Sequence, residues 1–320
     1  MLGDYMYKEM YHKIKKASVI YIYRHVASDY DALGSQFGLK EMILNHFQDK
    51  KVICMGEVNE SLYKQMDIVN EKQEFVALPN SLAIVLDTAN ASRIDGEGYD
   101  LCDDIIKVDH HIVVESYGKL NIEDPNASSA SELVCRFYEA NKDVMHLSKQ
   151  AATYLYYGIV GDTNRFMYDG ATSSTMHAAA ILLDAGIDKE EIYRTMYVRG
   201  IKDLEIQKYL LNHFVYDEGV AYYILHQKDL DTLDISREQG SNYVHVLSNI
   251  EEIKVWMAIT YQKEKDNYRV SLRSRNVPVQ PVASQFNGGG HLYASGATLS
   301  FLDDLSRMIA LIKEEIKHAI

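Results

Sequence analysis

Cysteine, proline and long apolar runs are all scarce in this 320-residue sequence. The three cysteines (Cys54, Cys102 and Cys135) lie far apart and form no C-x-x-C pair, which disfavours a disulfide framework and a structural zinc site. The longest apolar runs fall well short of the roughly 18 residues that a membrane span needs. The first residues are polar and mixed in charge, unlike a secretory signal peptide. We therefore expect a cytoplasmic protein with no membrane partner.

Basic residues are fewer than acidic ones. Lys and Arg number 33 against 46 Asp and Glu, which leaves a formal net charge of −13. This balance works against non-specific binding to long nucleic acid, so a duplex is not an expected partner. A short or small anionic substrate remains compatible, because bound divalent ions and a few arginines could reverse the sign locally.

The rest of the composition is that of a folded globular protein. Hydrophobic residues make up 47% and charged residues 25% of the chain, which excludes disorder and coiled coil as dominant states. At roughly 150 residues per domain the length indicates about two domains. With only four prolines and no low-complexity tract, no linker is marked by composition, so boundaries must come from changes of pattern.

Apolar strand patterns alternate with helical patterns in the first half of the chain. Expected strands cover residues 18–23, 52–55, 82–86 and 105–108, and expected helices cover 33–46, 131–140 and 149–160. This alternation is typical of βαβ units, in which a parallel sheet is covered on both faces. We therefore predict an α/β fold with a Rossmann-like parallel sheet in an N-terminal domain, residues 1–190.

The pattern changes in the second half. Residues 173–214 are almost continuously helical in character, and we assign 191–213 as a helical linker. Strand patterns return at residues 221–225, 256–262 and 268–273, and an amphipathic helix follows at 303–316. The prediction for residues 214–320 is a smaller α+β domain.

Carboxylates and imidazoles gather where the expected strands end. They are His25, Asp29 and Asp31 after the first strand, Asp87 after the strand at 82–86, Asp109, His110 and His111 after the strand at 105–108, and Asp162 after a long apolar stretch. In an open parallel sheet, ligands bind at the carboxyl ends of the strands. Each cluster alone has an ordinary explanation, since an Asp after a strand is usually a turn residue or a helix cap.

Taken together, these clusters favour a metal site. Carboxylates so crowded would repel one another and need cations. A mixed set of carboxylates and imidazoles without thiols suits Mn²⁺, Mg²⁺ or Fe²⁺ better than structural zinc. There are enough ligands for two ions, with one Asp bridging them.

Two features of the second domain could bind phosphate. Gly288, Gly289 and Gly290 precede His291, and successive glycines let backbone N–H groups converge on an anion. Arg273 and Arg275 alternate on a strand pattern, and arginine suits bidentate phosphate recognition. A flexible turn and two ordinary surface arginines are the alternatives.

Four motifs in this order resemble those of the DHH phosphoesterases. They are HVASDYDALGS (residues 25–35), LDTA (86–89), VDHH (108–111) and GDT (161–163). SLRSRN (271–276) and NGGGHLYASGA (287–297) resemble the domain that accompanies DHH domains, so the resemblance covers nearly the whole chain. The length is most similar to the stand-alone nanoRNase and pAp-phosphatase type. Ser28 and Asn164 depart from the family pattern, where Pro and Gly are common.

The resemblance implies a role for each matching residue. His25, Asp29 and Asp87 would hold one metal, and Asp31, Asp87, His110 and Asp162 the second, with Mn²⁺ favoured over Mg²⁺ or Fe²⁺. Asp109 would orient an imidazole, and His111 would face the substrate phosphate as the catalytic group. Arg273, Arg275, Gly288, Gly289, Gly290 and His291 would bind the substrate end away from the scissile bond.

The expected activity is two-metal phosphoester hydrolysis, in which a metal-bridging hydroxide attacks phosphorus in line. Expected substrates are short oligoribonucleotides (nanoRNA) and 3′-phosphoadenosine 5′-phosphate (pAp). The motifs leave open a phosphodiesterase for pApA or c-di-AMP, and a nucleotide-binding regulator with an inactive site. A family II pyrophosphatase is disfavoured by the GGGH segment. No G-x-G-x-x-G follows the first strand, which counts against a Rossmann oxidoreductase. A homodimer is compatible with the sequence.

Overall fold

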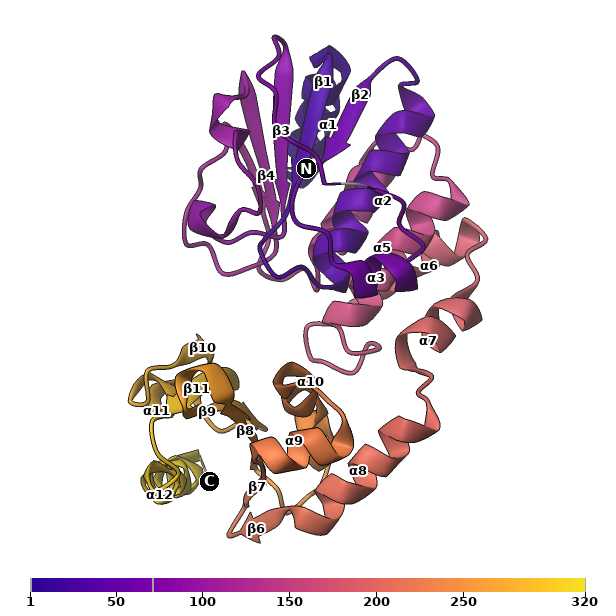
Figure 1. Ribbon diagram of the computed structural model, residues 1–320. Helices are drawn as coiled ribbons and strands as arrows, with labels where there is room; N and C mark the ends of the chain where they lie inside the picture. The colour runs from indigo at the N-terminus through magenta and orange to yellow at the C-terminus, as the bar shows by residue number, and fades with distance from the viewer. Residues whose placement is uncertain (1, 71, 320) are drawn as a thin grey trace. The chain divides into compact units, whose positions relative to one another are not determined.

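A five-stranded parallel sheet forms the centre of the first half of the chain in the computed structural model (Figure 1). The structure describes residues 2–70 and 72–319. The sheet order is β2-β1-β3-β4-β5, formed by β1 (Val19–Tyr23), β2 (Lys51–Cys54), β3 (Ser81–Leu86), β4 (Asp104–Asp109) and β5 (Leu120–Glu123). β1 and β3 are buried along their whole length, as the near-continuous apolar sequence of a central parallel strand requires.

The strand order reverses between β1 and β3. From β1 the chain crosses to β2 on one side, and it then returns to β3 on the other side of β1. Such a switch point opens a crevice at the carboxyl ends of the two strands, where ligands bind in sheets of this class. The loops that follow β1 and β3 carry His25 and Asp87, so the topology brings these two residues to one crevice.

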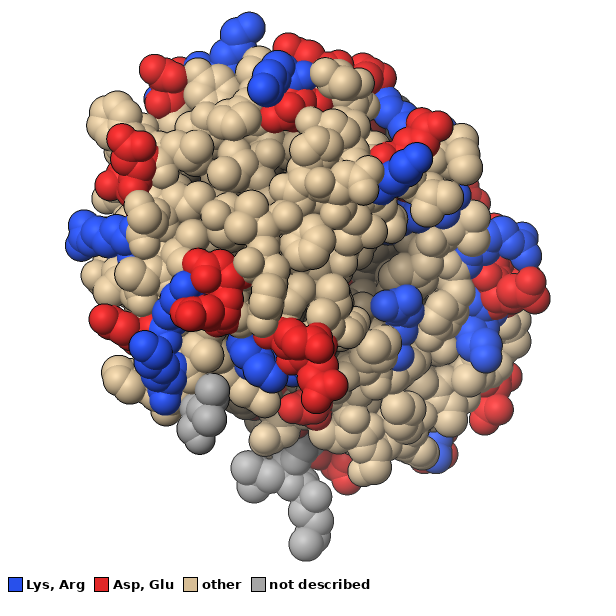
Figure 2. Space-filling view, turned by 90° about the horizontal axis from the view of Figure 1, so that it is seen from below, with Lys and Arg blue, Asp and Glu red and all other residues tan. Residues whose placement is uncertain are grey.

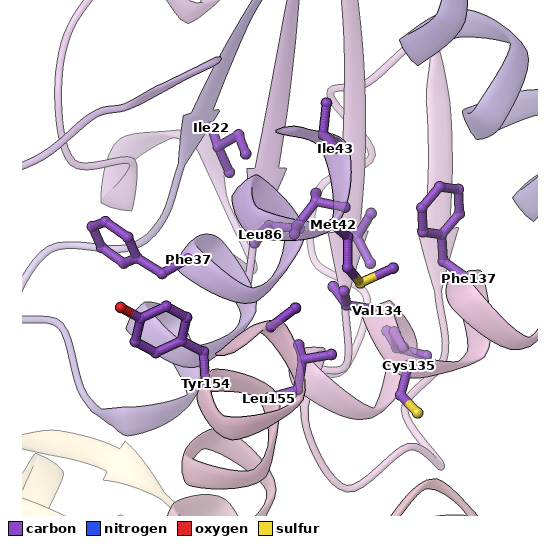
Figure 3. Close-up of a cluster of buried hydrophobic side chains, with 14 of the residues drawn as sticks. Ile22, Phe37, Met42, Ile43, Leu86, Val134, Cys135, Phe137, Tyr154 and Leu155 are labelled. Carbon is purple, nitrogen blue, oxygen red and sulfur yellow. The ribbon is translucent and has the colours of Figure 1, made fainter. Parts of the chain in front are cut away.

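Helices cover one face of this sheet. They are α1 (Leu2–Lys16), α2 (Tyr30–His46), α3 (Glu60–Gln65), α4 (Ala130–Ala140), α5 (Lys149–Asp162), α6 (Ser173–Asp184) and α7 (Lys189–Tyr197). Figure 3 shows Phe37, Met42 and Ile43 of α2 in the core with Tyr154 and Leu155 of α5. A Cβ atom on Gly34 would lie 2.5 Å from the Tyr154 carbonyl oxygen, so only glycine allows α2 and α5 to pack this closely.

The opposite face of the sheet is covered by loops and by the short helices η1 (Ala91–Arg93) and η2 (Tyr99–Leu101). Tyr21, Tyr23 and Val85 form a smaller apolar cluster there. The strand at 104–109 places Lys107 on this same face, where it is fully buried. This loop-covered face therefore holds a buried charge close to the edge where the strands end.

The second part of the chain folds around a six-stranded mixed sheet. Its order is β10-β11-β9-β8-β7-β6, formed by β6 (Val215–Asp217), β7 (Val220–Leu225), β8 (Val255–Gln262), β9 (Asn267–Ser274), β10 (Gly289–His291) and β11 (Ala294–Leu299). Its helices are α8 (Ile201–His213), α9 (Gln227–Leu233), α10 (Arg237–Asn242), α11 (Gln280–Ser284) and α12 (Asp304–Ala319), with η3 (Tyr243–Leu247) and η4 (Lys263–Lys265). α12 packs Met308 and Ile312 onto one face of the sheet.

This architecture confirms the predicted fold class, a Rossmann-like parallel sheet followed by a smaller α+β unit. The chain divides into two compact units between Val198 and Arg199, inside the helical stretch that the sequence indicated. Neither α1 nor β5 is among the elements expected from the sequence. The buried residues Tyr7, Met10 and Ile14 in α1 have helical spacing, which is the signal that could have revealed it.

Within the described residues, none of the helices combines the length and the apolar character needed to cross a bilayer. On the face drawn in Figure 2, acidic and basic side chains of the described residues are interspersed.

Candidate metal centre

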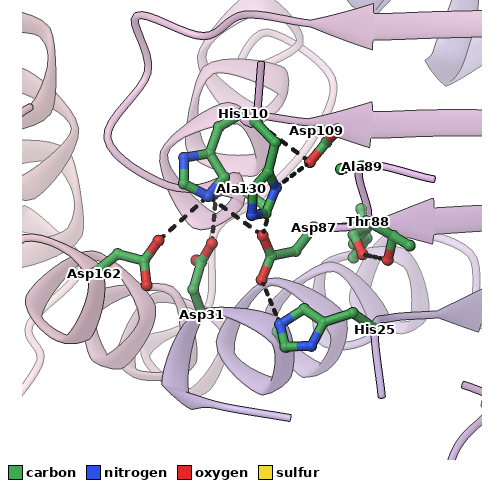
Figure 4. A network of polar contacts seen from close by, with 12 residues as sticks. His25, Asp31, Asp87, Thr88, Ala89, Asp109, His110, Ala130 and Asp162 are labelled. Atoms are coloured by element: carbon green, nitrogen blue, oxygen red, sulfur yellow. Dashed lines mark hydrogen bonds and ion pairs between the residues drawn. The ribbon is translucent and has the colours of Figure 1, made fainter. Parts of the chain in front are cut away.

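The carboxylate and imidazole side chains of the four motifs converge at the carboxyl ends of β1, β3 and β4 (Figure 4). Three groups of ligand atoms each lie within 4.8 Å of one another. The groups are His25, Asp29 and Asp87; Asp31, His110 and Asp162; and Asp87, His110 and His111. Asp87 belongs to two of these groups, so its carboxylate lies between His25 on one side and the two adjacent histidines on the other. Segments spread over about 140 residues of chain thus meet in one place.

His25 follows β1 and faces two carboxylates. Its Nε2 lies 3.2 Å from Asp87 Oδ2 and 3.6 Å from Asp29 Oδ2. Its Nδ1 lies 2.7 Å from the carbonyl oxygen of Val26, which can only accept, so we assign the proton to Nδ1. Nε2 then faces the carboxylates, and in the neutral imidazole its lone pair can bind a metal ion there.

Asp29 both caps a helix and faces the candidate metal site. Its Oδ1 accepts hydrogen bonds from the backbone N–H groups of Asp31 and Ala32 at 3.0 Å, so it caps the N-terminus of α2. Its Oδ2 remains directed toward His25. A helix cap and a candidate metal ligand therefore coincide in one side chain.

Asp31 is fully buried, and the N-terminus of α4 holds its carboxylate. Oδ2 accepts from the N–H of Ala130 at 2.7 Å, and Oδ1 accepts from the N–H of Ser131 at 2.9 Å. A Cβ atom on Gly158 of α5 would lie 2.0 Å from Ser131 Oγ and 2.7 Å from Asp31 Oδ1. Glycine at 158 thus lets α5 approach closely enough to bring its own carboxylate, Asp162, to the site.

One carboxylate oxygen of Asp87 lies in a position that suits a cation. Its Oδ1 is buried and accepts no hydrogen bond within the described part of the chain. His110 Nε2 lies 3.3 Å from this oxygen, and His111 Nδ1 lies 3.6 Å from it. A buried carboxylate oxygen that accepts no hydrogen bond is costly, so a metal ion between Asp87 Oδ1 and the two imidazoles fits this arrangement.

Asp162 is the last residue of α5, and its Oδ2 lies 3.3 Å from His110 Nε2. The chain then leaves the helix through Asn164, which has a φ of 45° in the left-handed region. Asparagine adopts this region more readily than most residues, so it can replace the glycine that the family pattern favours there. The departure at Asn164 therefore leaves Asp162 at the site.

Asp109 and His111 form a second layer beside the candidate ligands. His111 Nδ1 lies 2.8 Å from Asp109 Oδ1. On the other side, Asp109 Oδ2 lies 3.2 Å from the ammonium group of Lys107. The imidazole of His111 is 30% exposed, whereas Asp109 is buried. Asp109 thus contacts the imidazole of His111 on one side and a buried ammonium group on the other.

Two buried cations at this site escaped the sequence analysis. Arg24 Nη1 pairs with Asp95 Oδ2 at 2.6 Å and donates to the His25 carbonyl oxygen at 3.2 Å. Lys107 pairs with Glu123 Oε1 at 2.6 Å and lies beside Asp109. In the sequence, Arg24 is a lone basic residue between an apolar strand and a motif, and Lys107 is a lone basic residue within an apolar strand that leads into a motif. That placement is the signal that could have identified them.

The crowded carboxylates shift the pKa values of the groups around them. Burial by itself would lower the pKa of each histidine, but facing carboxylates raise that of His25 to about 11 and that of His110 to about 10. Burial and neighbouring carboxylates raise the pKa of Asp31 to about 7 and lift that of Asp162 well above its usual range. For Asp87, the two histidines outweigh burial and lower the pKa.

These shifts predict that metal binding releases protons. An imidazole must be neutral to coordinate, whereas the raised pKa values keep His25 and His110 protonated near pH 7.5 in protein stripped of metal. We expect Mn²⁺ titrations in two buffers of different ionisation enthalpy to give different heats, and we expect affinity to rise with pH. Heats that do not depend on the buffer would contradict this prediction.

The candidate substrate-binding residues lie in the second unit. His291 of β10 and Arg273 of β9 both pair with Ala294, so all three side chains share one face of the sheet. Arg275 lies just beyond β9 and donates to the Ile250 carbonyl oxygen at 2.9 Å, so the expected strand alternation does not reach it.

The glycine run also differs from the expected anion-binding turn. Gly289 and Gly290 belong to β10, an edge strand that pairs antiparallel with β11. A Cβ atom on Gly288 would lie 2.1 Å from the Gly296 carbonyl oxygen. Close approach of two chain segments therefore requires glycine at 288.

Comparisons with known proteins agree with this arrangement. The model of the DHH family, N-terminal domain, matches residues 19–159, and that of the DHHA1 domain matches residues 217–318. A probable bifunctional oligoribonuclease and PAP phosphatase NrnA of Streptococcus mutans is 40% identical over 91% of this chain and 93% of its own. The bifunctional oligoribonuclease and PAP phosphatase NrnA of Bacillus subtilis is 32% identical over 95% and 97%.

Among solved structures, an exopolyphosphatase-related protein from Bacteroides fragilis superposes with a TM-score of 0.81 at 26% identity, covering 98% of this chain and 96% of that one. The motifs, the fold and the relatives thus agree over nearly the full length. The chain belongs to the DHH family and is a phosphoesterase, with a DHH domain followed by a DHHA1 domain.

Proposed function

We propose that this protein hydrolyses short oligoribonucleotides and pAp, with Mn²⁺ as its preferred ion. The observation that carries the proposal is the convergence of His25, His110 and their carboxylate neighbours on Asp87, whose Oδ1 accepts no hydrogen bond in the described structure. The choice of substrates is supported by the S. mutans and B. subtilis relatives, whose names state both activities.

Within this proposal, each candidate ligand has a place. His25, Asp29 and Asp87 would hold one divalent ion, and Asp31, Asp87, His110 and Asp162 would hold the other. When bound, the ions would supply an activated water and positive charge for the phosphoryl oxygens. The fit is supported by the donor set, which is hard and free of thiols, because such donors suit Mn²⁺ and Mg²⁺.

His111 is proposed to contact the phosphoryl group that is transferred. Its Nδ1 contacts Asp109 at 2.8 Å, which fixes the ring and leaves Nε2 to face a phosphate oxygen. Its partial exposure supports this role, since a substrate must be able to reach it. Asp109 serves to hold the imidazole in place, because its own carboxylate is buried.

The second unit is proposed to bind the substrate end away from the scissile ester, through Arg273, Arg275, Gly288, Gly289, Gly290 and His291. The shared sheet face of His291 and Arg273 supports this, because the small Ala294 between them leaves room for a phosphate. We propose residues 1–190 as the catalytic domain, 191–213 as a connecting linker and 214–320 as the substrate-binding domain.

Replacing His291 with alanine is expected to raise KM by about 10- to 100-fold, because a hydrogen bond to a charged phosphate is lost. The value of kcat and the amount of bound metal should stay unchanged, since His291 lies outside the candidate ligand set. His318→Ala, at an exposed position in α12, is the matched control. Loss of metal from the His291 variant would contradict the assignment.

The proposed place of action is the cytoplasm, which is supported by three buried, unpaired cysteines. The proposed assembly is a homodimer, which sedimentation velocity measures directly.

The test of the proposed function is a direct comparison of substrates. Mn²⁺-dependent rates are measured on pAp, pApA, c-di-AMP and a length series of RNA oligomers. We expect the largest kcat/KM values for pAp and for the shortest RNAs. A clear preference for c-di-AMP, a preference for pApA over two-residue RNAs of other sequence, or binding of pAp without hydrolysis would contradict the proposal.

A further inference from the structure

Lys107 is a fully buried cation next to the candidate metal centre, and nothing in the proposed function uses it. It lies in β4, two residues before Asp109, so the two side chains share one face of the sheet. Asp109 in turn pairs across the sheet with Glu123 of β5. One ammonium group therefore lies between two carboxylates on the loop-covered face.

The ammonium group connects three separate segments. Nζ donates to the carbonyl oxygens of Ala89 at 3.2 Å and Glu115 at 2.9 Å, and to Glu123 Oε1 at 2.6 Å. These three bonds use all the donors of an ammonium group. Ala89 follows Asp87 by two residues, and Glu115 lies in the loop after His111. Lys107 thus ties the loop after β3 to the loop after β4.

Two residues of the loop after β4 make further contacts around the ammonium group. The Tyr117 ring lies 5.1 Å from Nζ, and its hydroxyl donates to the Thr88 carbonyl oxygen at 2.9 Å. Ser116 Oγ donates to Glu123 Oε2 at 2.7 Å. Because Lys107 is fully buried, solvent screens its charge less than it would screen a surface charge.

Asp109 depends on this charge. Its Oδ1 contacts His111, while its Oδ2 accepts no hydrogen bond in the described structure and lies 3.2 Å from Lys107 Nζ. Without the ammonium group, Asp109 would be a buried carboxylate held on one side only. An isolated buried charge is costly, so the carboxyl group would rotate away from its present position.

We infer that Lys107 is a positioning residue, which holds Asp109 and, through it, the imidazole of His111 in the orientation that contacts the substrate phosphate. This inference rests on the proposed function for the role of His111. The link from Lys107 through Asp109 to His111 is a separate claim about the protein itself, and it can be measured without substrate.

Lys107→Met is expected to lower kcat by about 10- to 100-fold, the usual effect of losing an outer partner of this kind. KM and the amount of Mn²⁺ bound per chain should change little. Lys13→Met is the matched control, because Lys13 pairs with Asp104 at the opposite end of the same strand at 2.6 Å. It should keep the wild-type kcat.

A second variant separates positioning from stability. Lys107→Met leaves the carboxylates of Glu123 and Asp109 without their cation and should lower the melting temperature. Lys107→Met combined with Glu123→Gln also removes the charge of Glu123 and should recover part of that loss. We expect kcat to stay low in the double variant, because Asp109 still lacks its cation. Recovery of kcat together with stability would overturn the inference.

Two further measurements complete the test. In a His111→Ala background, Lys107→Met should add little to the loss of kcat, and losses that multiply would overturn the inference. In protein stripped of metal, NMR should show faster solvent exchange of the His111 Nδ1 proton in Lys107→Met, and unchanged exchange would also overturn it. Absence of turnover by the wild type would contradict the proposed function and leave this NMR result valid.

Discussion

Replacing Asp87 with alanine is expected to abolish binding of both metal ions and to lower kcat by more than about 1,000-fold. Asp87 Oδ2 lies 3.2 Å from His25 Nε2, and Oδ1 lies 3.3 Å from His110 Nε2, so its two oxygens serve the two halves of the candidate site. Metal analysis of the purified variant and hydrolysis of pAp measure both effects.

The control for this variant is Asp67→Ala. Asp87 and Asp67 both have positive φ values, 53° and 52°, so alanine strains the backbone equally at the two positions. Asp67 is exposed and outside the candidate site, and its variant should keep wild-type metal content and activity. Retained turnover in Asp87→Ala, or loss of one ion only, would show that Asp87 does not bridge the two ions.

Replacing Gly158 with alanine is expected to destabilise the protein by about 1–3 kcal/mol or more and to weaken metal binding at the same time. The added Cβ would lie 2.0 Å from Ser131 Oγ and 2.7 Å from Asp31 Oδ1. Contacts this short cannot persist, so α5 must move away from α4 and carry Asp162 with it. Thermal unfolding and Mn²⁺ titration measure the two effects.

Gly170→Ala provides the matched control, because a Cβ atom there would meet no atom within 4 Å. It should melt within a degree or two of the wild type, as surface substitutions usually do. A stable Gly158→Ala protein with unchanged metal affinity would show that close packing of α5 on α4 is not what positions Asp31 and Asp162.

Several parts of the site could be predicted from the sequence because they are local. Asp29 and Asp31 follow an apolar strand directly, and Asp109, His110 and His111 are consecutive, so motif order alone predicts that they share one edge of a parallel sheet. Local patterns also indicated that the apolar stretch before Asp162 is helical, although the structure extends that helix to Asp162 itself.

Other parts depend on contacts between segments distant in the chain. The carboxylate of Asp31 is held by backbone N–H groups of Ala130 and Ser131, about 100 residues away, and no pattern around Asp31 indicates this. The glycine run at 288–290 suggested an anion-binding turn, but pairing with β11 made it an edge strand. In the sequence, Lys107 is a single basic residue in an apolar strand. Only the structure shows that its ammonium group donates to three segments, at Ala89, Glu115 and Glu123.

The amino-acid sequence alone determined the fold class, the family and the identity of the candidate ligands, because strand periodicity and motif chemistry are local properties of the chain. The tertiary structure alone decided which oxygen of each carboxylate faces an imidazole, which helix end holds Asp31, and which buried cation stands behind Asp109. Those outcomes depend on close packing between segments that are far apart in sequence, and packing distances of a few ångströms are not encoded in any single stretch of residues.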